Sequence, residues 1–99
     1  MLAIHDKAEN GKLTLALEGR LDTTTAPELE KKLSESVAGV TELVLDLDRL
    51  DYISSAGLRV LLAGQKIMNR QGSMTLTHVH ETIMEILEVT GFVDILTIE

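Results

Sequence analysis

The sequence predicts an α/β domain whose mixed β-sheet carries its helices mainly on one face. Segments that alternate between apolar and polar residues, as strands do, are interspersed with segments whose apolar residues recur every three to four positions, as in helices. Their order is β-β-α-β-α-β-α-β. An Asn10-Gly11 pair separates the first two strand-like segments, and such a pair is typical of a tight hairpin. Because crossovers between parallel strands are right-handed, a sheet that grows in one direction gathers its helices on a single face.

The first half of the chain predicts a hairpin, a loop and a helix. We expect strands at residues 2–9 and 12–18, then a polar loop at residues 19–24. Thr25-Ala26-Pro27-Glu28 has the form of a capping box with proline in the first turn, which favours a helix start there. The apolar residues of this helix and its stop signal follow at the expected spacing: Leu29, Leu33, Val37 and Gly39.

The second half begins with a nearly all-apolar segment, residues 43–47, which is typical of a central strand. A helix is expected from Ala56 to about Arg70, where Gly72 follows as a stop signal. The remaining expected elements are a strand at residues 74–77, a helix at 81–90 that ends at Gly91, and a last strand at 94–98.

Length and composition predict a single domain over residues 1–99 that can bury one core, with hydrophobic residues forming 44% of the chain. The absence of cysteine excludes disulfides and thiolate metal sites. A net charge of −7 with few aromatic residues argues against nucleic-acid binding. No apolar run reaches the roughly 20 residues of a membrane span, and the N-terminus lacks the pattern of a signal peptide, so a cytoplasmic location is expected.

Two serines, Ser54 and Ser55, stand where a loop enters the predicted helix. The first N–H groups of a helix have no partner within it, and the helix dipole is positive at this end. A phosphate on a serine at this junction would therefore meet ready-made donors. Either serine could instead be a simple N-cap, and Ser54 is the more natural candidate for that role.

Gly57 in the first helical turn also indicates a constraint. Glycine there costs up to about 1 kcal/mol relative to alanine. Either a partner approaches the backbone at this position, or the loop packs tightly against Tyr52 or a neighbouring strand.

Other polar groups support no enzyme or metal site. His78 and His80 could face one side of an extended segment, but no third ligand stands nearby in sequence. Asp46, Asp48 and Asp51 lack the placement of a receiver domain's phosphoacceptor site. The chain contains no glycine-rich phosphate loop, no cofactor motif and no supported catalytic triad, so we expect neither an enzyme nor a cofactor.

The whole chain resembles a STAS domain, the family named for sulfate transporters and anti-sigma factor antagonists. Four segments in the family's order carry the resemblance: residues 18–22 (EGRLD), residues 43–47 (LVLDL), residues 52–58 (YISSAGL) and residues 90–94 (TGFVD). Residues 52–58 correspond to the family's switch loop, and this name is kept below. The resemblance implies the STAS fold, a mixed sheet with helices mainly on one face.

Stand-alone members of this family act in bacterial partner-switching pathways. The resemblance implies that the unphosphorylated protein binds an anti-sigma factor and thereby frees the sigma factor. It also implies that the anti-sigma factor, a serine kinase, phosphorylates the antagonist and ends the complex. A metal-dependent serine phosphatase of the PP2C type would remove the phosphate. The antagonist is a substrate and a binding module rather than a catalyst.

The family's switch loop usually reads Asp-Ser-Ser/Thr-Gly-Leu, with the phosphate on the serine after the aspartate. When the loop is aligned on Gly57 and Leu58, the phosphoserine falls on Ser55. Ser54 replaces the aspartate and Ala56 replaces the next hydroxyl residue, and both changes bear on recognition by a kinase. Asp22 and Asp46 match acidic or polar positions that border the loop in the family.

The favoured hypothesis is therefore an anti-sigma factor antagonist phosphorylated on Ser55. Its expected partner face comprises Asp22, Thr23, Thr24, Thr25, Ser54, Ser55, Ala56, Gly57, Leu58 and Arg59. The altered neighbours of Ser55 keep an alternative open, a non-phosphorylated STAS subunit of a larger assembly such as a lipid-transport ABC complex. The cytoplasmic tail of an anion transporter is disfavoured because the sequence contains no membrane segment.

Overall fold

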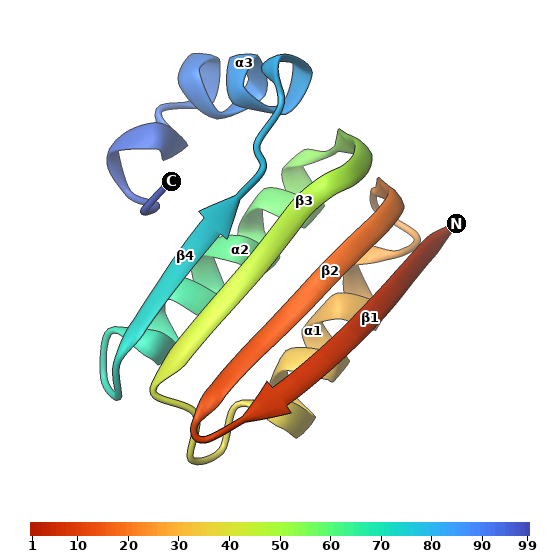
Figure 1. Cartoon of the computed structure of the whole chain (residues 1–99). Coiled ribbons are helices and arrows are strands. Elements are labelled where there is room, and N and C mark those ends of the chain that lie inside the picture. Colours follow the sequence, from red (N-terminus) through yellow and green to blue (C-terminus); the bar gives the residue numbers. More distant parts are fainter.

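The computed structural model describes residues 1–99 and contains one sheet and three helices. In chain order the elements are β1 (Leu2–Glu9), β2 (Lys12–Leu21), α1 (Ala26–Ser36), β3 (Glu42–Ile53), α2 (Ser55–Met68), β4 (Ser73–Thr77), α3 (Glu81–Thr90) and the 3₁₀ turn η1 (Phe92–Asp94). The strand order is β1-β2-β3-β4, antiparallel between β1 and β2 and parallel elsewhere. Figure 1 shows α1 and α2 on one face of the sheet, so the predicted architecture is confirmed. No helix is both long enough and apolar enough to span a membrane.

The predicted hairpin forms at Asn10 and Gly11. Both residues have positive φ, 49° and 82°, which is the conformation that a tight two-residue hairpin requires. The hairpin sets the register of β1 against β2, with Glu9 opposite Lys12. The third helix also ends as predicted, at Gly91 in the left-handed region with φ of 80°.

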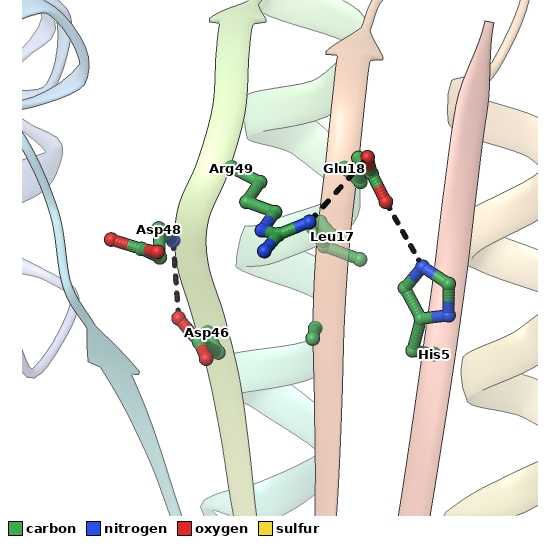
Figure 2. Close-up of a pocket in the computed structure, with 7 residues that line it drawn as sticks. His5, Leu17, Glu18, Asp46, Asp48 and Arg49 are labelled. Atoms are coloured by element: carbon green, nitrogen blue, oxygen red, sulfur yellow. Dashed lines mark hydrogen bonds and ion pairs between the residues drawn. The ribbon is translucent and has the colours of Figure 1, made fainter.

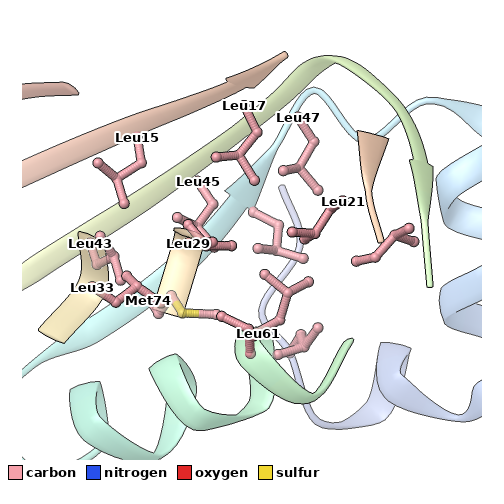
Figure 3. Close-up of a cluster of buried hydrophobic side chains, with 14 of the residues drawn as sticks. Leu15, Leu17, Leu21, Leu29, Leu33, Leu43, Leu45, Leu47, Leu61 and Met74 are labelled. Atoms are coloured by element: carbon pink, nitrogen blue, oxygen red, sulfur yellow. The ribbon is translucent and has the colours of Figure 1, made fainter. Parts of the chain in front are cut away.

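Rows of leucine and methionine across β2, β3 and β4 form the centre of the core (Figure 3). One row pairs Leu13 with Leu43 and Met74, and the next pairs Leu15 with Leu45 and Leu76. The helices cover these rows with further buried aliphatic side chains: Leu29 and Leu33 from α1, and Leu58, Val60, Leu61 and Met68 from α2. Each fully buried leucine contributes about 1.5–3 kcal/mol, so the parallel register is held mainly by this apolar match.

Strand β3 is longer than predicted and contains two irregularities. The expected strand ends at residue 47, but β3 continues to Ile53, and β2 extends into the first half of the expected loop, as far as Leu21. The register with β2 shifts twice, and each shift places one extra residue in β3. As a result the buried residues Leu47, Leu50 and Ile53 recur every three positions instead of every two. A search for strict alternation therefore misses this half of the strand.

The predicted last strand, residues 94–98, is wrong in extent. Phe92–Asp94 form a 3₁₀ turn, and the strand is reduced to one parallel bridge between Leu76 and Ile98. Two backbone hydrogen bonds hold the bridge, from Leu76 N–H to the Thr97 carbonyl and from Glu99 N–H to the Leu76 carbonyl. The left-handed turn at Gly91 leads directly into the 3₁₀ turn, so the chain reaches the edge of β4 only at its end.

Replacing Leu45 by alanine should lower the free energy of unfolding by about 2–5 kcal/mol, because its side chain is fully buried in the central row. Urea denaturation monitored by circular dichroism measures the loss. Val44→Ala is the matched control, because Val44 is only half-buried and should cost less. Equal losses for the two variants would contradict the assignment of the core to the helix-covered face.

Candidate functional site

Ser54 is the N-cap of α2. Its side-chain oxygen accepts a hydrogen bond from the Gly57 N–H at 3.3 Å, and its carbonyl accepts the Leu58 N–H at 2.9 Å. Its own N–H donates to the carbonyl of Leu21, at the end of β2, at 2.8 Å. A serine cap of this kind is typically worth about 1 kcal/mol. Ser54 therefore has the structural role that the sequence favoured for it.

Ser55 is the first residue of α2 and has a different environment. Its side chain is exposed, and its hydroxyl forms no hydrogen bond within the chain. Because Ser54 provides the cap, the Ser55 hydroxyl is not needed to hold the helix. An enzyme that acts on hydroxyl groups could therefore reach it without first breaking the fold.

Gly57 allows the first turn of α2 to sit directly on the ends of β2 and β3. A Cβ at this position would lie 2.7 Å from Cγ of Leu21 and 3.0 Å from Cγ1 of Ile53. Of the two interpretations of Gly57, this contact matches internal packing, although Tyr52 is not among the nearest atoms. Gly57 is buried, so it positions Ser55 and offers little surface of its own.

Asp22 organises the loop beside the switch loop. Its carboxylate accepts hydrogen bonds from the Thr24 hydroxyl at 2.8 Å and from the N–H groups of Thr24 and Thr25 at 3.0 and 3.1 Å. The Thr24 hydroxyl, with help from these N–H groups, holds the pKa of Asp22 below its usual value.

The predicted capping box does not form. The Thr25 side chain does not cap α1, because its hydroxyl donates to the Arg20 carbonyl at 2.8 Å and accepts the Asp22 N–H at 2.8 Å. Thr25 is buried and serves as an internal tie between the end of β2 and the start of α1. Its hydroxyl is therefore committed and is not available to a partner.

Arg20 lies beside Tyr52, the first residue of the switch loop, and this pairing was not predicted. The Arg20 guanidinium lies 4.4 Å from the centre of the Tyr52 ring, and its Nε lies 3.8 Å from an Asp22 oxygen. The two residues are partners in the β2–β3 register, beyond both irregularities of β3. No local pattern in the sequence indicates this pair, because the shifted register decides which side chains meet.

The remaining predicted partner residues gather at the same end of the sheet. Thr23, Ala56 and Arg59 line one hollow between the starts of α1 and α2. Arg59 is exposed, makes no ion pair, and stands four residues after Ser55 on α2. The loop before α1 and the first turns of α2 thus line one hollow.

The two histidines do not form a metal pair. The Nδ1 of His78 lies 2.9 Å from Oδ1 of Asp46, whereas Nε2 of His80 contacts the Leu50 carbonyl. No cluster of three or more potential metal ligands exists in the structure. Asp46 lies on β3 ahead of both irregularities and does not border the switch loop, so that part of the family correspondence is corrected.

The face of the sheet away from α1 and α2 contains a shallow polar hollow (Figure 2). Glu18 is central to it, 3.1 Å from Nε2 of His5 and 4.0 Å from Nη1 of Arg49. Asp46 accepts the Asp48 N–H at 3.1 Å and also contacts His78. Because most of these charged groups already have partners within the chain, the hollow is a weaker candidate than the switch-loop surface.

A mixed sheet with α1 and α2 on one face, and an exposed serine at the start of α2, are the features expected of a STAS domain, and sequence comparison identifies the same family. The family description "STAS domain" matches residues 3–99. The chain belongs to the STAS domain family.

The relatives of the chain within this family are regulators. BtrV of Bordetella bronchiseptica, whose name places it among the anti-sigma factor antagonists, is 41% identical over 88 residues; the match covers 87% of this chain and 76% of BtrV. Such antagonists are regulatory binding proteins and not enzymes.

Solved structures show the same fold at low sequence identity. An anti-sigma factor antagonist from Mycobacterium paratuberculosis superimposes with a TM-score of 0.89 at 21% identity, covering 99% of this chain and 85% of that one. The Bacillus protein SpoIIAA gives TM-scores of 0.77 in its unphosphorylated form and 0.76 in its phosphorylated form, at 17% and 18% identity. Both comparisons cover 98% of this chain, with 87% and 91% of the SpoIIAA chains.

Gly57→Ala should lower the free energy of unfolding by about 1–3 kcal/mol, because the added methyl group would overlap Leu21 and Ile53. The same substitution at Gly64, in the middle of α2, is the matched control. A Cβ there would meet only the ends of Met74 and Leu33, at 3.3 and 3.4 Å, and the gain in helix propensity should offset this contact. Urea denaturation of both variants measures the contrast, and equal effects would refute the packing role of Gly57.

Asp22→Asn should destabilise the protein at neutral pH and lose this effect in acid. Since the folded-state pKa of Asp22 is lowered, its charged form stabilises the fold above the ordinary pKa of 3.8. That contribution disappears as the pH falls through the folded-state pKa, below 3.8. Melting temperatures at pH 7 and at lower pH should therefore converge for the two proteins. Asp51→Asn is the control, because this exposed carboxylate accepts no hydrogen bond and should cause no such change.

Proposed function

We propose that this protein is an anti-sigma factor antagonist in a partner-switching pathway. In its unphosphorylated form it binds an anti-sigma factor that is also a serine kinase, and phosphorylation of Ser55 releases it. The observation that carries the proposal is Ser55 itself, an exposed serine with an uncommitted hydroxyl at the family's phosphoserine position. The regulatory name of its relative BtrV supports the same role.

The division of work between the two serines supports Ser55 as the acceptor. Ser54 caps α2 through the Gly57 N–H, so its oxygen is engaged. In the family this position is usually aspartate, which can also accept N–H groups as a cap. Ser54 therefore preserves the capping function of the aspartate while lacking its charge.

A phosphate on Ser55 would change the surface and leave the fold in place. It would add a charge of about −1.5 to −2 at the positive end of the α2 dipole, where an anion is tolerated. Arg59 is one helical turn away and has no other ion-pair partner, so its guanidinium can turn to the phosphate. The switch would thus act by altering the charge that the partner meets.

The partner surface in this proposal combines both loops at the end of the sheet. Thr23, Ala56 and Arg59 are accessible in one hollow, beside Asp22 and Thr24. Ser54 and Gly57 contribute indirectly, because they hold the first turn of α2 in place. A serine phosphatase of the PP2C type would restore the binding form.

A second candidate function is a non-phosphorylated STAS subunit of a larger assembly, such as a lipid-transport ABC complex. The specific observation in its favour is the switch loop itself. Ser54 and Ala56 replace the acidic and hydroxyl residues that usually flank the family's phosphoserine. In this role the same surface would hold a permanent partner, and Ser55 would stay unmodified.

Incubation with the anti-sigma factor kinase of its own organism, ATP and Mg²⁺ should add one phosphate to the protein. Intact-mass spectrometry should detect the phosphate in the wild type and in Ser54→Ala, but not in Ser55→Ala. Ser54→Ala is the matched control, because it removes the neighbouring hydroxyl and should cost only about 1 kcal/mol of stability.

Two results would contradict the proposal in different ways. A phosphate that persists in Ser55→Ala and disappears in Ser54→Ala would move the acceptor by one residue. No phosphate at all, together with capture of a transporter ATPase from lysate of the same organism, would favour the second candidate function.

A further inference from the structure

A continuous groove runs along the outer surface between α1 and α2. It consists of three adjoining hollows, the first of which begins at Thr23 and Ala56 beside the switch loop. The first and second hollows share Pro27, Glu30 and Val60. The second and third share Ile67, and the third ends at Arg70 and Gln71. We call this surface, lined by residues of α1, of α2 and of the loops before α1 and after α2, the interhelix groove.

The floor of the interhelix groove is apolar and shallow. Helix α2 contributes Ala56, Val60, Ala63 and Ile67, which recur at the spacing of a single helical face. Pro27 of α1 lies opposite them. From Ala56 to Arg70 the groove follows α2 for about 21 Å, at about 1.5 Å per residue. This length matches a partner helix of about four turns.

The rim of the groove is basic although the chain is acidic. Four of the nine Lys and Arg residues line the groove, and Glu30 is the one acidic residue among them, which gives a local charge of +3 in a chain of −7. The four are Lys31, Arg59, Lys66 and Arg70. Helix α2 itself contains no Asp or Glu.

These four basic side chains also lack ion pairs within the chain. Lys12, Arg20, Lys32 and Arg49 each have a carboxylate within 4.0 Å. None of the four groove residues does, and Lys7 on β1 is the one other Lys or Arg without such a partner. The uncompensated positive charge of the protein is therefore concentrated along one apolar groove.

We propose that the interhelix groove is a docking surface for an acidic amphipathic helix of the protein partner. The apolar side chains of that helix would lie over Val60, Ala63 and Ile67, and its carboxylates would pair with Arg59, Lys66 and Arg70. A nucleic acid or an anionic membrane fits less well, because neither supplies a narrow apolar ridge that would lie along Val60, Ala63 and Ile67. The identity of the partner as an anti-sigma factor rests on the proposed function.

The groove also gives a physical route for release. Ser55 stands at its mouth, next to Ala56 and one turn before Arg59. A phosphate of about −1.5 to −2 at Ser55 would reduce the local charge from +3 to about +1 and would compete for Arg59. An acidic helix would then lose its strongest attraction at the end where the groove begins.

Calorimetric titration with the anti-sigma factor of the same organism tests the proposal. Ala63→Glu should weaken binding at least tenfold, because it places a bulky carboxylate on the floor opposite an acidic helix. Lys66→Glu should weaken binding about tenfold at low salt and less at high salt. The matched controls are Ala38→Glu and Lys7→Glu, which make the same changes at exposed positions outside the groove and should stay within twofold of the wild type. Circular dichroism confirms that each variant is folded.

A second experiment tests binding to the groove without the anti-sigma factor. A synthetic acidic amphipathic helix of about four turns is titrated into the ¹⁵N-labelled protein, and amide shifts at Val60, Ala63 and Ile67 are expected. If the wild type binds the anti-sigma factor and neither Ala63→Glu nor Lys66→Glu changes the affinity, the groove is not the docking surface. The proposed function would then still stand. Wild type that fails to bind the anti-sigma factor, yet shows these peptide shifts, would overturn the proposed function alone. Binding of anionic vesicles or single-stranded DNA through these residues, without peptide binding, would contradict the proposal that the groove binds a helix of a protein partner.

Discussion

The candidate site depends on one close contact, that of the first turn of α2 with the ends of β2 and β3. Gly57 leaves room for Leu21 and Ile53, and the Ser54 N–H donates to the Leu21 carbonyl. The contact ties the helix N-terminus to the strands whose leucines form the core. Ser55 is thereby held in place at the surface, although its hydroxyl makes no hydrogen bond within the chain. A reactive group can be well placed because its neighbours, and not the group itself, are constrained.

Local sequence signals were sufficient for most of the fold. Asn10-Gly11, the helical spacing of Leu29 and Leu33, and Gly91 each act within a few residues, and the structure confirms all three features. The second half of β3 could not be predicted, because its extra residues exist only relative to β2. The extent of the last strand was wrongly predicted for a similar reason, because it depends on which residues reach β4, and only Ile98 pairs there, with Leu76.

In the candidate site, too, local features could be predicted from the sequence and features that depend on the three-dimensional arrangement could not. The distinction between Ser54 as cap and Ser55 as exposed hydroxyl follows from helix chemistry and was available from the sequence. The Thr25 tie to the Arg20 carbonyl was not, because the competing capping-box pattern is equally local and points to the wrong partner. The Arg20–Tyr52 contact and the row of unpaired basic residues depend on how separate elements meet in space. Such features can be identified only from the three-dimensional structure.

The two register shifts in β3 have a consequence for how this protein can vary in length. Each extra residue reverses which side chains face the helices, and the pair together brings Ile53 back to the buried side. Losing or gaining one residue between Leu47 and Ile53 would expose Ile53 and rotate the following serines away from their present direction. A change of two residues preserves the facing but shortens or lengthens the reach of the strand. This stretch can therefore accept many substitutions at its exposed positions, but a change in its length by a single residue would reverse the direction of Ile53 and of the serines that follow it.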